Sequence, residues 1–256
     1  MKKLLLALSA TFVIATSYIN ADKIAEYTPV TNDADTVAAA VISPKAIAGE
    51  MPVSTISNTQ TLYSKLDFTG KNTLNFEVFE KAMKGFENLK KAGKIDAETK
   101  LLTVCDFSLS SNKKRLWIFN METGEILFNS LVAHGKNTGE EFATKFSNTE
   151  SSLQSSLGFY LTDATYHGEN GYSLKLLGMD NGYNDAALKR AVVMHGADYV
   201  SEEFAAQHKR IGRSWGCPAV PRALAEPIIN TIKGKNVLFI YYPDQKYLSS
   251  SKWLNA

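Results

Sequence analysis

The most informative segment of the chain is residues 213–220, which read Arg-Ser-Trp-Gly-Cys-Pro-Ala-Val. Its cysteine, Cys217, follows a His-Gly pair at His195 and Gly196. A thiol is a useful nucleophile only as the thiolate, and a nearby imidazole can take its proton and return it to a leaving amine. The pattern therefore predicts a cysteine nucleophile with a histidine base, which is the chemistry of acyl transfer.

The residues around this pair suit that chemistry. Gly216 lets the backbone approach a substrate closely, so the amides around Gly216 and Cys217 are candidate donors to a developing oxyanion. The apolar residues 191–194 predict a short buried strand that delivers His195 at its end, where a rigid scaffold meets a loop. Gly196 then leaves room beside the imidazole.

The two motifs together resemble a known family. His195-Gly196 followed by residues 212–217, Gly-Arg-Ser-Trp-Gly-Cys, is similar to the active-site signature of L,D-transpeptidase catalytic domains, which have the YkuD-like fold of bacterial cell-wall enzymes. The motif is most similar to that of the murein L,D-transpeptidase variant branch, in which Ser-Trp-Gly-Cys-Pro replaces the more widespread Ser-His-Gly-Cys. Further matching stretches extend the resemblance from about residue 101 to residue 242: 131–135, 146–148, 155–160 and 171–174.

The resemblance implies a fold that is mainly β with a few helices (α+β), with a sandwich-like core that carries the cysteine in a cleft. It implies that the substrate is the stem peptide of peptidoglycan, cut at an L-to-D peptide bond. Cys217 would hold the stem as a thioester and His195 would act as base and then as acid. Gly216, Ser214 and Gly196 would support the turn, the imidazole or the oxyanion. An acceptor amine from a neighbouring stem would complete a crosslink.

Two departures from the main family concern substrate binding. The family has a histidine before the Gly-Cys and usually an arginine two residues after the cysteine, where this chain has Trp215 and Ala219. We therefore expect Arg213, with Arg222 as the alternative, to grip a substrate carboxylate through two parallel hydrogen bonds. In the other interpretation Arg213 only braces the loop through backbone carbonyls. We also expect Trp215 to contact substrate.

His134 has two interpretations as well. It ends the apolar run 131–133 in front of Gly135, so it either lines the same cleft as His195 or caps a strand. His167 and His208 have polar surroundings and are expected at the surface.

Three functions stay open at this point. A transpeptidase and a hydrolytic L,D-carboxypeptidase or endopeptidase differ only in whether an amine or water resolves the thioester, and water exclusion is a property of the closed cleft. The third function is a non-catalytic wall-binding module, which an intact Cys217 and His195 disfavour.

The second cysteine, Cys105, lies in the apolar run 101–105 and is expected to be a small buried hydrophobe. A disulfide with Cys217 would consume the nucleophile, so both thiols should be free in the active form. A zinc site built from Cys217, His134, His195 and His208 is disfavoured, because no pair has the short ligand spacing of zinc motifs. We expect no metal and no other cofactor.

The first 21 residues have the plan of a secretory signal peptide. Lys2 and Lys3 precede an apolar stretch over residues 4–15, polar residues follow, and we expect cleavage after Ala21, although Ile19 is large for the recognition position. The stretch is too short for a full membrane span. We therefore expect an exported protein of the periplasm or cell envelope, with no stable membrane insertion after cleavage.

Charge excludes some partners. The chain has 28 Lys and Arg residues and 26 Asp and Glu residues, and the predicted signal removes two lysines and no acid, so 26 of each sign are left. A neutral chain gives no electrostatic reason to bind nucleic acid or an anionic membrane. The oligomeric state is not predicted.

The rest of the chain divides simply. Residues 22–61 are rich in Ala, Thr, Val, Ser and Asn and predict a flexible linker. Residues 62–100 form a helical N-terminal segment, with an amphipathic helix expected over 74–91. Residues 101–247 make the catalytic domain. Within it we expect a hairpin over 116–128, a helix over 223–232 and a final strand over 237–241.

Overall fold

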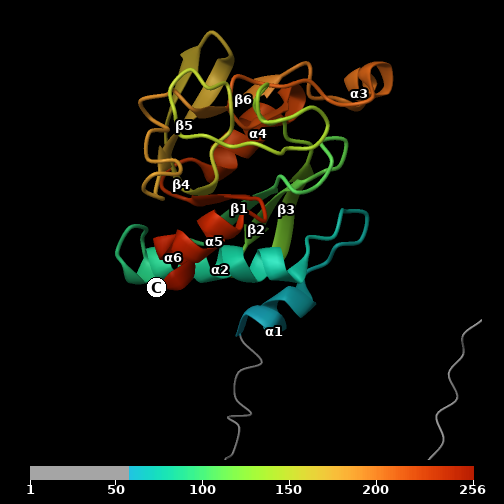
Figure 1. The fold of residues 1–256 in the computed structure, drawn as a ribbon. Helices are drawn as coiled ribbons and strands as arrows, with labels where there is room; N and C mark the ends of the chain where they lie inside the picture. Colours follow the sequence, from blue (N-terminus) through green and yellow to red (C-terminus); the bar gives the residue numbers. More distant parts are fainter. Residues whose placement is uncertain (1–57) are drawn as a thin grey trace, which may run out of the picture. The chain divides into compact units, whose positions relative to one another are not determined.

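One mixed sheet of eight strands organises the computed structural model, which describes residues 58–256 (Figure 1). The strands are β1 (Leu101–Asp106), β2 (Leu116–Asn120), β3 (Glu125–Ser130), β4 (Gly158–Gly168), β5 (Gly171–Gly178), β6 (Val193–Ala197), β7 (Ala219–Pro221) and β8 (Val237–Tyr241). The helices are α1 (Asn58–Lys65), α2 (Phe76–Lys91), α3 (Glu202–His208), α4 (Arg222–Ile232), α5 (Gln245–Ser250) and α6 (Lys252–Asn255). The expected class, mainly β with several helices, is confirmed.

The strand order is β3-β2-β1-β8-β4-β5-β6-β7. Neighbours pair antiparallel except for β1 with β8 and β6 with β7, which are parallel. The chain just after β3 reaches the opposite edge, where the Ala133 amide donates to the Ala219 carbonyl over 2.8 Å. The sheet therefore curls until the segment that follows edge strand β3, residues 131–136, lies beside the other edge strand, β7.

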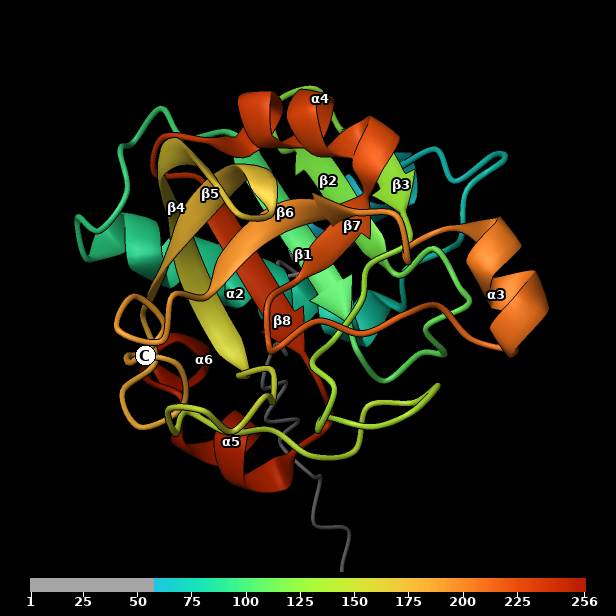
Figure 2. The same cartoon turned by 90° about the horizontal axis from the view of Figure 1, so that it is seen from above.

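The central strands have apolar side chains on both faces because both faces are covered. All five residues of β8, Val-Leu-Phe-Ile-Tyr, are buried. Helix α2 packs against β1 and β8, while α4 packs against β5, β6 and β7. Figure 1 shows α4 above and α2 below the strands β1 and β2, and Figure 2 shows α3 projecting at the edge of the molecule. The predicted strand over 237–241 and the predicted hairpin, now β2 and β3, are confirmed.

Helix α2 is amphipathic, as the sequence predicts. Asn75 caps its start by accepting the Glu77 amide through its side chain over 2.8 Å. Phe79 and Leu89 are buried in the main core. On the same helix, the buried Asn88 side chain donates to the Trp253 carbonyl of α6 over 2.9 Å. The helix therefore shares one core with the sheet and with the C-terminal helices.

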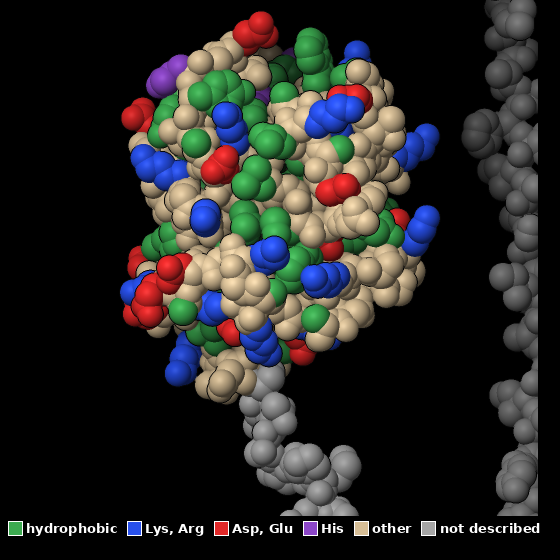
Figure 3. All heavy atoms as spheres, turned by 90° about the vertical axis from the view of Figure 1, so that its left-hand side faces the viewer, with side chains coloured by type: hydrophobic (Ala, Val, Ile, Leu, Met, Phe, Trp, Pro, Cys, Tyr) green, Lys and Arg blue, Asp and Glu red, His purple; other side chains and the backbone are tan. Residues whose placement is uncertain are grey.

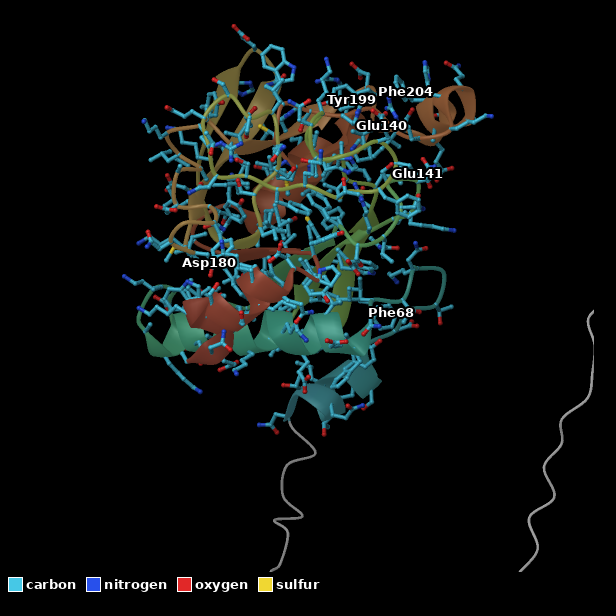
Figure 4. All side chains as sticks on the ribbon, viewed as in Figure 1. Phe68, Glu140, Glu141, Asp180, Tyr199 and Phe204 are labelled. Atoms are coloured by element: carbon cyan, nitrogen blue, oxygen red, sulfur yellow. The ribbon has the colours of Figure 1, made fainter. Side chains whose placement is uncertain are left out.

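A buried carboxylate fixes those C-terminal helices. Asp180, labelled in Figure 4 beside α5 and α6, accepts the Phe159 amide over 2.7 Å and the Ser251 hydroxyl over 2.6 Å. Tyr247 donates its hydroxyl to the same side chain over 3.3 Å. Burial raises the pKa of Asp180, and these three donors oppose that shift. Sequence periodicity did not predict α5 and α6, because each is too short to show a period.

Two expectations need correction. The predicted linker over 22–61 ends too late, because residues 58–61 already belong to α1. The strand predicted over 191–194 has the wrong bounds. Strand β6 begins at Val193 and has His195 in its middle, because residues 196 and 197 still pair with β7. The predicted signal peptide, residues 1–21, and the remainder of the predicted linker lie outside the described residues.

The surface is mixed in charge. On the face shown in Figure 3, Lys and Arg side chains are interspersed with Asp and Glu side chains, and hydrophobic side chains lie between them. Among the helices of residues 58–256, none has the length and apolar character needed to cross a bilayer.

Candidate active site

The parallel pair β6 and β7 brings the predicted nucleophile and base together. His195 of β6 stands in register with Ala219 of β7. Cys217 lies two residues before Ala219, so it lies beside Val193, two residues before His195 on the neighbouring strand. Adjacent strands are about 4.8 Å apart and two residues span about 6.6 Å. Residues that are 22 positions apart in the chain therefore share one small region.

The cysteine sulfur is held by the backbone at the start of β6. The Val193 amide donates to Cys217 Sγ over 3.5 Å, and the thiol points to the Ala191 carbonyl with the sulfur 3.9 Å from the oxygen. The Cys217 residue is partly exposed, whereas Cys105 in β1 is completely buried. The chain therefore has one accessible thiol within the described residues, and it lies at the motif.

A tight turn presents this thiol. Gly216 has φ +126, a conformation that side chains disfavour, and a Cβ at this position would lie only 2.7 Å from the Gln154 carbonyl oxygen. The Ser214 hydroxyl donates to the Cys217 carbonyl over 2.6 Å and accepts the Gly216 amide over 3.0 Å. The side chain of Ser155 donates to the Gly216 carbonyl over 3.1 Å. Glycine at 216 and serine at 214 are thus required by the shape of the turn.

These bonds also limit which amides can stabilise an oxyanion. The Gly216 amide is occupied by Ser214, whereas the Cys217 amide has no protein acceptor in the described part of the chain. The Cys217 amide is therefore the better candidate donor of the two.

The imidazole of His195 is oriented by its own neighbour. Its Nδ1 atom lies 3.1 Å from the Gly196 carbonyl oxygen, so Nδ1 carries the proton in the neutral ring and donates it there. Nε2 is left as the basic nitrogen. A Cβ at Gly196 would lie 2.7 Å from the Cβ of Ala225 on α4, so a glycine is needed for β6 to pack this closely on the helix.

Both reactive groups are neutral at rest. Burial lowers the pKa of His195, and the nearby Arg222 guanidinium lowers it further against the opposing bond to Gly196. Burial raises the pKa of Cys217, although the Val193 amide and the Arg190 charge oppose the shift. The His195 ring and the Cys217 sulfur make no direct hydrogen bond within residues 58–256. The site therefore holds a neutral thiol and a neutral imidazole whose Nε2 has no hydrogen-bond partner among the described residues.

His134 lies behind the cysteine turn and is almost completely buried. Its Nδ1 accepts from Arg115 Nη2 over 2.8 Å, and its Nε2 lies 3.3 Å from the Gly139 carbonyl oxygen. Its own carbonyl accepts the Ser214 amide over 3.0 Å. Burial and the Arg115 charge lower the pKa of His134 to about 3, so this ring stays neutral. Both ring nitrogens have protein partners.

Arg213 and Trp215 flank the same turn. Nη1 of Arg213 donates to Glu140 over 2.7 Å and to the backbone carbonyls of Lys136 and Gly139 over 3.0 Å each. These are the contacts expected of a loop brace. Trp215 is 79% exposed, more than any other large hydrophobic residue among those described. Figure 4 labels Glu140 at the end of the molecule that carries α3.

Comparison with known proteins gives the family. The model of the L,D-transpeptidase catalytic domain matches residues 70–241, which is most of the chain. The chain belongs to the L,D-transpeptidase catalytic domain family. The resemblance seen in the sequence is thereby confirmed. A comparison with curated proteins finds no match.

The chain is also similar to solved structures, among them those of three bacterial proteins. An L,D-transpeptidase from Mycobacterium smegmatis has 13% identity and a TM-score of 0.35, covering 56% of this chain and 59% of that one. The helical cell shape determining protein Pgp2 from Campylobacter jejuni has 14% identity and a TM-score of 0.39, covering 64% and 57%. An L,D-transpeptidase from Stackebrandtia nassauensis has 12% identity and a TM-score of 0.35, covering 73% and 90%. The chain spans under two thirds of the length of the first two.

Sequence reasoning missed several residues of this candidate site. Arg115, Ser155 and Arg190 all contact the segments that shape the cysteine turn, and of the three only Ser155 lies in a stretch that matches the family. Arg222, the alternative charge carrier, pairs with Asp198 over 2.7 Å and lies near His195. The matching stretch 155–160 was a signal for Ser155. No local pattern marks Arg115 or Arg190, because the sequence does not show where a side chain points.

The structure also bears on the two cysteines and on the zinc site that the sequence disfavours. Cys105 and Cys217 are both free. Burial raises the pKa of Cys105 to about 12, so it stays a thiol. Within residues 58–256, no three His, Cys, Asp or Glu side chains are grouped so that they could hold a metal ion.

Proposed function

We propose that this chain is a peptidoglycan L,D-transpeptidase with Cys217 as nucleophile and His195 as base. The observation that carries the proposal is the arrangement on β6: the partly exposed Cys217 sulfur is held by the Val193 amide, and His195 commits Nδ1 to a carbonyl and keeps Nε2 free. Membership of the family supports the same reading. Export to the periplasm or cell envelope follows from the predicted signal over residues 1–21 and from where this substrate is found.

In the first half-reaction, His195 Nε2 takes the Cys217 proton as the sulfur attacks the carbonyl carbon of the L-centre in the stem peptide. The C–S bond forms while the C–N bond to the terminal D-amino acid breaks. The imidazolium gives its proton to the departing amine. The stem is then held as a thioester and His195 is neutral again.

In the second half-reaction, the amine of a neighbouring stem attacks the thioester carbonyl. His195 takes a proton from that amine, the new amide bond forms and the C–S bond breaks, and the proton returns to the sulfur. The Cys217 amide stabilises the oxyanion in both halves. A donor of this kind contributes about 3 to 4 kcal/mol to transition-state stabilisation in other acyl-transfer enzymes.

The experiment is to incubate the full chain with tetrapeptide-stem muropeptides and to weigh the products. Crosslinked dimers together with a free D-amino acid are expected. Shortened monomers without dimers would contradict the transfer half and would indicate a hydrolase. Unchanged substrate, with no thioester adduct on the protein, would contradict the enzymatic function. The Cys217→Ala variant is the control for both products.

A further inference from the structure

Arg190 lies three residues before β6 and has its guanidinium fixed by the loop over residues 147–156. Nη1 donates to the Ser147 carbonyl over 2.8 Å and also to the Ser156 hydroxyl. Nη2 donates to the Gln154 carbonyl over 2.7 Å and to the Ser152 hydroxyl over 3.1 Å. Four neutral acceptors thus hold one planar cation in a single orientation.

The same guanidinium touches the cysteine turn. Arg190 Nη2 lies 3.4 Å from where a Cβ of Gly216 would stand. The Gln154 carbonyl oxygen, which Arg190 binds, lies 2.7 Å from that same point. Arg190 therefore joins the 147–156 loop to the residue directly before Cys217.

The charge of Arg190 has no carboxylate partner. The ion pairs in the described part of the chain involve other residues, and the acceptors of Arg190 are carbonyls and hydroxyls. Its Nε atom is buried and has no hydrogen-bond partner. Arg190 is half-buried, and a partly desolvated cation without a counter-charge favours an anion that forms nearby. The thiolate of Cys217 is that anion.

The other titratable groups around the sulfur are few. His195 lies on β6, and Tyr199 follows that strand and interacts electrostatically with Cys217. The neighbouring segment 134–136 contributes His134, which is turned to Arg115, and the exposed Lys136. The stretch 152–155 has no ionisable side chain.

The backbone between Arg190 and β6 is strained. Ala191 has φ +52, in the left-handed region that residues other than glycine avoid. Its carbonyl faces the Cys217 thiol and the Val193 amide follows two residues later. Such strain persists only where surrounding contacts impose it. The amides of residues 190–192 donate to carbonyls of residues 186–188, and the side-chain bonds of Arg190 hold the same turn against the 147–156 loop. The turn 190–193 thus brings a cation, a carbonyl and an amide to one sulfur.

We propose that Arg190 is a positioning residue of this site, which stabilises the Cys217 thiolate by its fixed charge and clamps the 147–156 loop against Gly216. The inference deepens the proposed function and rests on Cys217 being its nucleophile. The charge would act in both half-reactions, since the sulfur is an anion when it attacks and again when it leaves.

The test is the pH dependence of alkylation of the full chain by iodoacetamide, which reads the thiolate of Cys217 without any cell-wall substrate. Arg190→Gln is expected to move the midpoint up by about one pH unit, which lowers the rate at pH 7 roughly tenfold. Arg190→Lys keeps the positive charge but loses the planar guanidinium with its paired donors, so its midpoint should shift less than that of Arg190→Gln. Lys189→Gln is the matched control: that side chain is 74% exposed and pairs with Glu150, so its midpoint should equal that of the parent. Cys217→Ala should take up no label.

An unchanged midpoint in Arg190→Gln would overturn the charge role, even if the variant were less stable. Equal shifts in the Gln and Lys variants would overturn it as well, because loosening alone would then explain both. If Arg190→Gln does not fold, the Lys variant decides. Lysine keeps the positive charge, so a midpoint raised by about one pH unit or more in Arg190→Lys would contradict the proposal. Failure of the muropeptide assay together with the expected shift would reject the substrate and leave the role of Arg190 intact.

Discussion

The backbone amide of Val193, at the start of β6, donates to the sulfur of Cys217, 3.5 Å away in the turn before β7. The same strand carries His195 two residues later. The spacing of the proposed nucleophile and the proposed base is therefore set by the repeat of one β-strand, which is stiffer than a loop. Because β6 is buried along its whole length and packed under α4, a change there would displace both reactive groups together.

Replacing Cys217 by alanine should abolish turnover and leave the fold intact, because the change removes one partly exposed sulfur from a turn held by other bonds. The expected loss is at least about 10³-fold, as for other nucleophiles. Product formation from muropeptides measures it, and thermal unfolding checks the fold. Cys105→Ala should keep activity and lose only packing. A folded but inactive Cys105→Ala would point to a redox role for that thiol.

Replacing His195 by alanine should slow acylation by a stem peptide about 10²-fold or more, since the base is gone. The pH profile should also change. Burial lowers the pKa of His195 below its ordinary 6.5, so the parent rate should fall only at pH values below that. In His195→Ala the reaction needs free thiolate, and the raised pKa of Cys217 makes the rate climb through pH 9. Single-turnover mass measurements across pH test this. Identical pH profiles of the parent and of His195→Ala would show that another residue is the base.

Two glycine variants should separate close packing from backbone strain. Gly216→Ala has to accept φ +126 and a contact of 2.7 Å with the Gln154 carbonyl, whereas Gly234→Ala meets only φ +85 and open space. We expect Gly234→Ala to cost about 1 kcal/mol of unfolding free energy and Gly216→Ala at least about 2 kcal/mol. Urea denaturation measures both. Equal costs would show that the turn can give way. Activity should be lost only at position 216.

His134 should make the protein sensitive to acid. The unfolded chain binds a proton on this histidine below about pH 6.5, whereas the folded chain does so only near its pKa of about 3. The unfolded state thus holds more protons between these values, and stability is lost as the pH falls through that window. His134→Gln keeps an acceptor for Arg115 and should remove this loss. Between pH 7 and pH 5 the parent should lose on the order of 1–2 kcal/mol more than the variant.

His208→Gln, at an exposed position on α3, is the matched control for that measurement. It should retain the acid sensitivity of the parent in urea denaturation at both pH values. If His134→Gln also retains it, other buried groups, His195 among them, account for the loss.

Local pattern was enough for the regular elements and for the motif. The amphipathic spacing of α2, the apolar run of β8 and the turn between β2 and β3 each depend on residues close together in the chain, so periodicity finds them. The Gly-Cys turn and the His-Gly pair are likewise short, and their residue types alone indicate a thiol with a base. The family and the α+β class followed from them, before any contact was known.

Contacts between distant segments could not be read in this way. Nothing near Arg190 in the chain shows that its guanidinium reaches Gly216, and nothing near His134 shows that Arg115 binds its ring. The end of β6 was misplaced for the same reason, since its last two residues are strand only because β7 pairs with them. Hydrogen bonding and burial depend on which segments meet when the sheet curls. Residue types therefore indicate the chemistry. The folded sheet determines the protonation states of His195 and Cys217, the tautomer of His195 and the exposure of Cys217.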